Sequence, residues 1–181
     1  MLDFKVILEI REKAIDSMKC DSDDESITSL WKKTIFIIFF YIAPIAVCVI
    51  AWIRDVKLTA LENYIGTGIA IFTGLFFSLL LSIGAKVRSE KENPNKDADN
   101  FQQFKTNMKQ IANITLYIIV AGIIIFLLLL LNTLLKSEDC LIVEKIFTTI
   151  VLFFLTRFIV SLFFMIQRFY FLVRDEINNI L

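Results

Sequence analysis

The sequence predicts an all-α fold, a four-helix transmembrane bundle with short cytoplasmic amphipathic helices, and three observations lead to this prediction. Of the 181 residues, 57% are apolar and the mean hydropathy is +0.70, whereas soluble proteins contain roughly 45–50% apolar residues. Four segments stay apolar over about the 20 residues that a helix needs to cross a bilayer. Lysine and arginine gather in alternate segments between them, as the charge rule for membrane orientation requires.

The predicted spans cover residues 34–53, 63–85, 110–135 and 146–170. Trp31 and Trp52 bracket the first span, and their separation of 21 residues is about 31 Å along a helix, which places one indole at each interface. Pro44 lies near the middle of this span and predicts a kink. Residues 1–33 carry 14 charged side chains, too many for a cleaved signal peptide, so we expect the first span to remain in the mature protein.

The distribution of lysine and arginine predicts the orientation. Residues 1–33 and the loop 86–109 hold six each, Arg168 and Arg174 follow near the C-terminus, and each of the other two loops holds two. Because short basic loops stay in the cytoplasm, we expect both termini to be cytoplasmic in a bacterial inner membrane. The expected domains are a cytoplasmic amphipathic N-terminal segment, a four-span transmembrane domain and a cytoplasmic tail, at residues 1–33, 34–173 and 174–181.

Two amphipathic helices are expected on the cytoplasmic side. Residues 3–19 place apolar side chains on one helical stripe, and residues 101–111 repeat them at spacings of three and four. The candidate cytoplasmic interface residues are Phe4, Ile7, Leu8, Ile15, Phe101, Phe104 and Met108. Two interpretations stay open for these helices: they dock a partner or another subunit, or they pack against the protein's own bundle or the lipid headgroups.

The second predicted span carries a small residue at every fourth position. The series is Gly66, Ala70, Gly74, Ser78 and Ser82. Such a ridge lets another helix backbone approach closely, and close packing drives helix association in lipid. We therefore expect a tight helix contact here, within the protomer or between protomers, with a pore lining as the alternative.

Arg157 lies near the middle of the fourth span, where an arginine costs about 2.5 kcal/mol or more on insertion scales. Ser161 and Arg168 lie within about 40° of it around the helix, so the three form a polar stripe that should avoid lipid. This stripe is either a pore lining or a buried polar stripe. Because no apolar segment contains Asp or Glu, the expected partners of the arginine are Asn113, Asn132, Ser78, Ser82, backbone carbonyl groups, water or a lipid phosphate.

Two interpretations of the arginine stay open. It is a structural arginine, buried or reaching the inner headgroups, or it lies in a water-filled cavity or anion path. In the second case a ring of arginines in a homo-oligomer would select against cations.

The composition argues against several function classes. There is no histidine, the three cysteines are far apart, and no metal-ligand set, nucleophile elbow or phosphate-binding glycine loop occurs. We therefore expect neither an enzyme nor a cofactor or metal. The 19 basic and 19 acidic side chains balance, which gives no electrostatic reason for direct nucleic acid binding. The absence of intramembrane carboxylates also argues against a proton-coupled exporter.

Four spans, both ends inside and amphipathic cytoplasmic helices form a layout that resembles small accessory membrane proteins of bacterial anti-phage defence, such as the Kiwa membrane subunit KwaA and the four-span proteins beside type VI CRISPR loci. The resemblance implies an oligomeric inner-membrane subunit that docks a cytosolic protein partner and senses or perturbs the membrane during phage infection. The alternative prediction is a homo-oligomeric anion channel or a holin-like pore. Both functions require membrane lipid and a homo-oligomer.

Overall fold

A computed structural model describes residues 4–19, 30–58, 62–91, 98–134 and 141–178. Nearly all of these residues are helical, which confirms the predicted all-α fold. The helices are α1 (Phe4–Lys19), α2 (Leu30–Ile37), the π-helix η1 (Ile38–Ile42), α3 (Ala43–Arg54), α4 (Glu62–Lys91), α5 (Ala98–Leu134) and α6 (Leu141–Asn178). Because α6 continues to Asn178, most of the predicted C-terminal tail is a helical extension of the fourth span.

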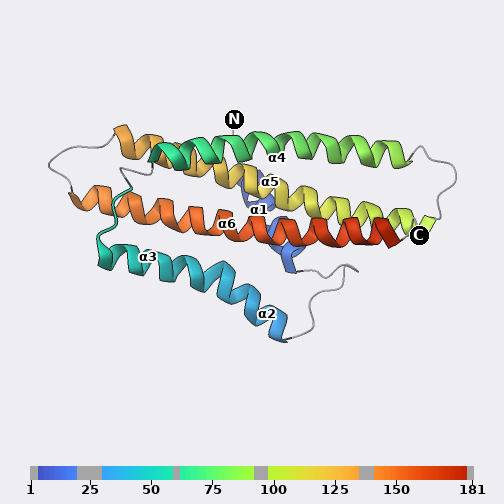
Figure 1. Ribbon diagram of the computed structural model, residues 1–181, viewed down its shortest axis with the longest axis horizontal. Helices are drawn as coiled ribbons and strands as arrows, with labels where there is room; N and C mark the ends of the chain where they lie inside the picture. The colour runs from blue at the N-terminus through green and yellow to red at the C-terminus, as the bar shows by residue number, and fades with distance from the viewer. Residues whose placement is uncertain (1–3, 20–29, 59–61, 92–97, 135–140, 179–181) are drawn as a thin grey trace.

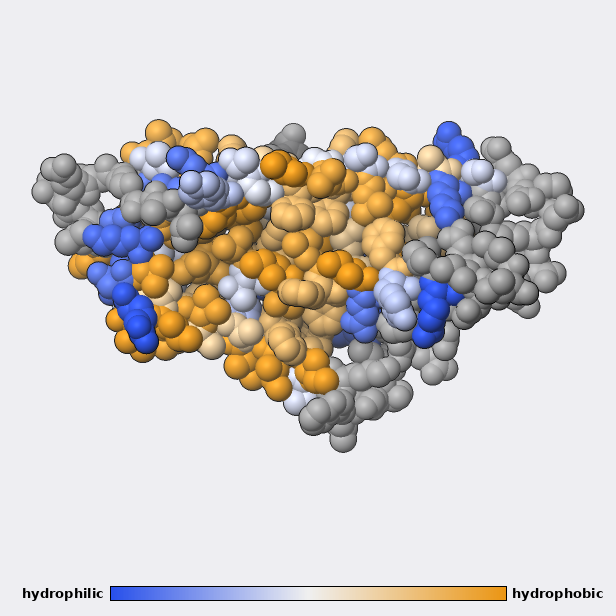
Figure 2. Space-filling view, in the orientation of Figure 1, coloured by the Kyte–Doolittle hydropathy of each residue, from blue (hydrophilic) through white to orange (hydrophobic). Residues whose placement is uncertain are grey.

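Four helical segments are long and apolar enough to cross a membrane, and they support a multi-pass membrane protein. They are Thr34–Arg54, Glu62–Ser89, Phe104–Leu134 and Ile142–Tyr170. Figure 2 shows apolar residues over the middle of one face and hydrophilic residues at both ends, the pattern that a hydrocarbon layer favours. With 37 residues, α5 is about 56 Å long, so it extends well past the roughly 30 Å of hydrocarbon.

The four spans lie side by side as a row in the order α4, α5, α6, α3 (Figure 1). Contacts join α4 to α5, α5 to α6, and α6 to α3, while α1 crosses the row and contacts α5. The central α5 has 44% of its most apolar window buried, whereas α4 at the edge has 11%. Most of the α4 surface therefore faces lipid or another protein chain.

The close approach between α4 and α5 occurs at Gly122, a residue that the sequence pattern did not single out. A Cβ atom at Gly122 would lie 2.5 Å from Thr73 Oγ1 and 3.4 Å from Ile69 Cγ2. Because no side chain occupies this space, the α5 backbone comes close to α4.

The predicted small-residue ridge on α4 does not make this contact. Gly66 meets only Leu129 Cδ1 at 4.0 Å, and among the described residues no atom lies within 4 Å of a Cβ built on Gly74. The last four ridge residues, Ala70, Gly74, Ser78 and Ser82, are exposed. The predicted tight contact is therefore not made within the protomer, since α5 packs on another face of α4.

The first span changes helix type before Pro44, where the sequence predicts a kink. The backbone N–H of Ala43 donates to the carbonyl of Ile38, five residues back, and residues 38–42 form the π-helix η1. Pro44 has no N–H, and its ring clashes with the carbonyl of Phe40, four residues earlier, so a wider turn relieves the conflict. Figure 1 shows the helix axis bending here, with α3 along α6 and α2 leaning away from it.

Candidate functional site

Arg157 lies halfway between two polar anchors on α6. Twelve residues before it, Lys145 Nζ is 2.9 Å from Asp55 Oδ1 and 4.9 Å from the ring centre of Trp52. Eleven residues after it, Arg168 Nη2 donates to the carbonyl of Ser17 on α1 at 3.0 Å. These separations correspond to about 18 Å and 17 Å along the helix. The anchors are thus about 35 Å apart, close to the thickness of a bilayer, and Arg157 lies near the middle of the apolar length between them.

The guanidinium of Arg157 is buried and incompletely satisfied. The residue is 8% exposed, and the described residues supply no hydrogen-bond partner for Nε or Nη2. A buried polar group without a partner is destabilising, and a buried charge more so, because water no longer solvates it. The burial of Arg157, together with its distance of about 17 Å or more along α6 from both anchors, favours the buried interpretation of the sequence over an arginine that reaches the headgroups.

Aromatic rings surround the guanidinium instead. Its central carbon, Cζ, lies 4.3 Å from the ring centre of Phe40, 5.7 Å from that of Phe153 and 5.9 Å from that of Tyr41. Phe40 is fully buried. A desolvated cation over an aromatic face gains about 2 kcal/mol, so Phe40 offsets part of the cost of burying the charge.

The π-helix is the element that presents these rings to α6. Phe40 and Tyr41 are adjacent residues of η1 and contact each other edge to face, with ring centres 5.4 Å apart. Phe36, one turn earlier, stacks on Phe40 at 5.2 Å and meets Phe164 of α6 at 5.5 Å. The π turn contains one extra residue, so the residues before it are rotated about the helix axis relative to those of α3. This rotation turns the aromatic side chains of α2 and η1 toward α6.

The side chains that the sequence offered as partners of Arg157 lie elsewhere. Asn113 Nδ2 donates to Ser17 Oγ at 3.1 Å, and Asn132 Nδ2 donates to Glu62 Oε1. Ser78 and Ser82 are exposed on α4, which contacts α5 rather than α6. These four side chains are thus engaged elsewhere or exposed, and of the predicted partners the backbone carbonyl groups, water and a lipid phosphate remain. The sequence did show that the first and fourth spans are both rich in phenylalanine. Which of these rings contact Arg157 depends on the tertiary structure.

The predicted polar stripe on α6 serves two different contacts. Ser161 is fully buried, and its Oγ donates to the backbone carbonyl of Arg157 at 2.8 Å. The hydroxyl group therefore has its hydrogen-bond acceptor within α6. Arg168 instead joins α6 to α1 through the Ser17 carbonyl. In the described protomer Arg157 and Ser161 form a buried stripe between helices rather than the wall of an open pore.

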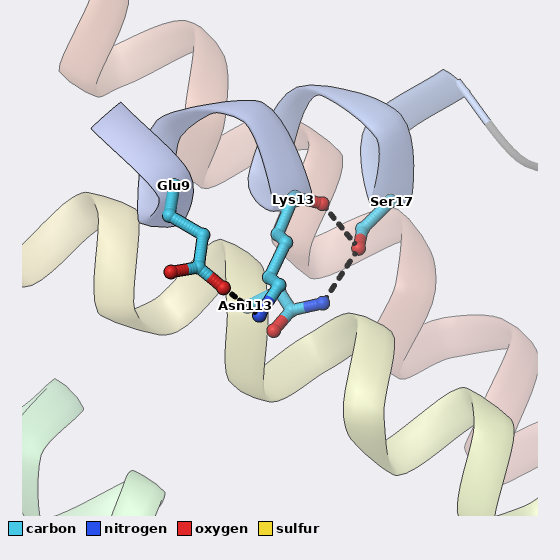
Figure 3. A network of polar contacts seen from close by, with 4 residues as sticks. All are labelled: Glu9, Lys13, Ser17 and Asn113. Atoms are coloured by element: carbon cyan, nitrogen blue, oxygen red, sulfur yellow. Dashed lines mark hydrogen bonds and ion pairs between the residues drawn. The ribbon is translucent and has the colours of Figure 1, made fainter. Parts of the chain in front are cut away.

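The amphipathic helix α1 packs against α5 through its apolar face. Ala14, Ile15 and Met18 are buried, in one cluster with Met108 of α5. Ser17 completes the contact: its Oγ accepts from Asn113 Nδ2 and donates to the Lys13 carbonyl at 2.7 Å (Figure 3). On the outer face of α1, Lys13 pairs with Glu9 at 2.5 Å.

This packing decides which predicted interface residues a partner can reach. Ile15 of α1 and Met108 of α5 are buried where these two helices pack together, which favours the interpretation that they pack within the protomer's own bundle. Ile7 and Phe104 are half-buried, and Leu8 is 54% exposed. The side chains of Phe4 and Phe101 lie outside the described part of the chain.

The far end of the row carries an exposed ion pair. Asp55 ends α3 in the left-handed conformation, with φ 51° and ψ 46°. Its carboxylate accepts from Lys145, and this hydrogen bond, together with the charge of Lys145, lowers the pKa of Asp55 below its ordinary value. The pair links the first span to α6 next to a small cavity of about 130 Å³ lined by Asp55, Val56, Lys57, Glu144, Lys145 and Thr148.

Within the described ranges, no group of three or more His, Cys, Asp or Glu side chains is placed to hold a metal ion. Cys48 is a free thiol whose Sγ donates to the carbonyl of Thr149 at 3.4 Å. No protein family, curated protein or solved structure matches this chain. The function is therefore argued from the chain itself, and Arg157 is its most unusual feature.

Proposed function

We propose that this protein is a homo-oligomeric membrane module that lets anions cross the bilayer. The observation that carries the proposal is Arg157, a mid-depth guanidinium that is 8% exposed and has two nitrogens without partners among the described residues. An ionisable side chain inside a membrane usually marks a pathway for ions or substrates. A positive charge at the narrowest, driest point of such a pathway repels cations and attracts anions.

The pathway would run between α6 and the first span. The aromatic rings that cover Arg157 from the first span belong to η1, and this span forms one edge of the row. The structure then corresponds to a closed state, in which Phe40 and Tyr41 shield the charge. A π turn next to a proline is a place where a helix can bend at low cost, so movement of the first span about residues 38–42 would uncover Arg157.

Assembly would use the opposite edge. Along α4 the exposed ridge Ala70, Gly74, Ser78 and Ser82 offers a nearly flat surface that a second chain can approach closely. Several copies placed edge to edge would cover both edges of each row. We propose this arrangement as the source of the homo-oligomer that the sequence predicts.

The test is ion flux in liposomes that contain the purified protein. We expect chloride to pass in preference to potassium, and we expect Arg157→Leu to abolish the chloride flux. Arg54→Gln is the matched control, because it removes one positive charge from an exposed arginine at the end of α3. Unchanged chloride selectivity in Arg157→Leu, or no flux through the unmodified protein under any applied voltage or lipid composition, would overturn the proposal.

A second candidate function is the docking of a cytosolic partner by an anti-phage defence subunit. The observation that favours it is the exposure of Val6 (50%) and Leu8 (54%), which lie on the two sides of the α1 face that packs against α5. We expect a complex of fixed stoichiometry from the native host that is lost in Leu8→Asp and retained in Glu12→Gln, an exposed control on the same helix. If both variants behave alike, these apolar side chains face lipid headgroups instead.

A further inference from the structure

The two unpartnered nitrogens of Arg157 lie on the same edge of its guanidinium. Nε–H and Nη2–H point in parallel from one side of the planar group, so a single acceptor can bind both. This is the edge that arginine uses in bidentate contacts with anions. Both nitrogens are buried, and neither is satisfied by any of the described residues.

A partner that carries negative charge would compensate the part of the cost that the aromatic rings leave. A water molecule would satisfy the N–H groups, but it would leave a buried cation uncompensated, and isolated buried charges are strongly unfavourable. The described carboxylates near the helix ends are already engaged or distant: Asp55 pairs with Lys145, and Glu62 accepts from Asn132. Glu144 is 13 residues from Arg157 on the same helix, about 20 Å away.

The surroundings also limit the size and the chemistry of the partner. The guanidinium carbon lies over the ring of Phe40 at 4.3 Å, so an aromatic face rather than a polar group covers this side of the charge. The site is nearly closed to solvent, and a lipid phosphate at the level of the nearer anchor would be about 17 Å away along α6, too far to reach the guanidinium. An anion that enters must also shed its water, which doubly charged sulfate or phosphate resists more than a halide or nitrate does.

We infer that the Nε and Nη2 edge of Arg157 is a binding site for one small, weakly hydrated monovalent anion of the halide or nitrate class, held between α6 and η1. The bound ion neutralises the guanidinium, and the ring of Phe40 stays in contact with it. This inference deepens the proposed function by naming the class of anion. It rests on the proposed function only where it takes the bound anion to be the anion that crosses the bilayer.

The experiment measures chloride binding to the protein in detergent micelles by the excess linewidth of the ³⁵Cl NMR signal. We expect saturable broadening that nitrate and bromide remove at lower concentration than sulfate does. Arg157→Gln should abolish this broadening, and Arg157→Lys, which keeps the charge but lacks the two-pronged edge, should weaken binding about tenfold or more. Arg54→Gln, the exposed control, should bind as the unmodified protein does.

Circular dichroism and gel filtration show whether each variant is folded. If Arg157→Gln does not fold, competition in the unmodified protein decides: equal displacement by nitrate and sulfate, or no saturable broadening at all, overturns the inference. Binding without flux in liposomes would overturn the proposed function and leave the site standing. Selective chloride flux without saturable binding would overturn the site alone.

Discussion

The guanidinium carbon of Arg157 lies 4.3 Å from the ring centre of Phe40, and this contact joins the middle of α6 to the π-helical turn of the first span. The positive charge of Arg157, which is unfavourable in lipid, is thus covered by η1, where the backbone departs from the regular α-helix. A movement of the first span about residues 38–42, as proposed above, would therefore also break a contact that stabilises the folded protein.

Phe40→Leu removes the aromatic face from the charge. We expect it to lower the free energy of unfolding by about 2 kcal/mol, the value of a desolvated cation–π contact, in denaturant titrations of the detergent-solubilised protein. Phe39→Leu is the matched control, because Phe39 is 53% exposed in the same turn and should tolerate the same change. Equal effects of the two substitutions would show that the Arg157 contact contributes nothing specific.

Gly122→Ala places a methyl group against α4. We expect a loss of about 1 to 3 kcal/mol in unfolding free energy, because the added Cβ would lie 2.5 Å from Thr73 Oγ1 and tightly packed interiors resist overpacking. The double variant Gly122→Ala, Thr73→Ala should recover most of the loss, since it removes the clashing oxygen. A stable single variant would mean that the two helices separate easily at this crossing.

Gly74→Leu tests the opposite face of α4. Among the described residues nothing lies within 4 Å of a Cβ built on Gly74, so we expect the protomer to keep its helix content and unfolding free energy. We expect a smaller particle in size-exclusion chromatography with light scattering, because the bulky side chain prevents close approach of a second copy. An unchanged particle mass would exclude this ridge from the oligomer interface.

The Asp55–Lys145 pair predicts a pH dependence outside the membrane. Lys145 lowers the pKa of Asp55 in the folded protein, so the stabilisation is present above the unfolded value of about 3.9 and is lost as the pH falls through the lower folded value. In Asp55→Asn, which tolerates the positive φ of 51°, the carboxylate is absent. We therefore expect the stability difference between the two proteins to shrink from pH 6 to pH 3. A constant difference would show that the ion pair is not formed in solution, as happens for many exposed pairs.

The sequence was sufficient for the class of fold and for the most unusual residue. Long apolar segments have few alternatives to helices in lipid, because every backbone N–H and C=O must be satisfied within the segment. An arginine among such residues is conspicuous for the same reason, so the apolar pattern alone singles out Arg157. The cytoplasmic orientation, the defence role and the partner stay predictions.

Tertiary structure alone decided which faces meet. Helical periodicity shows that Gly66, Ala70, Gly74, Ser78 and Ser82 share a ridge, but it does not show that α5 packs on another face of α4, at Gly122. The contact between Arg157 and Phe40 could not be predicted either. The π turn before Pro44 rotates Phe40 about the helix axis, and a regular helical repeat does not predict that rotation. Spacing along one helix determines which residues lie on a common face, whereas the neighbour that covers the face depends on packing between segments far apart in the chain.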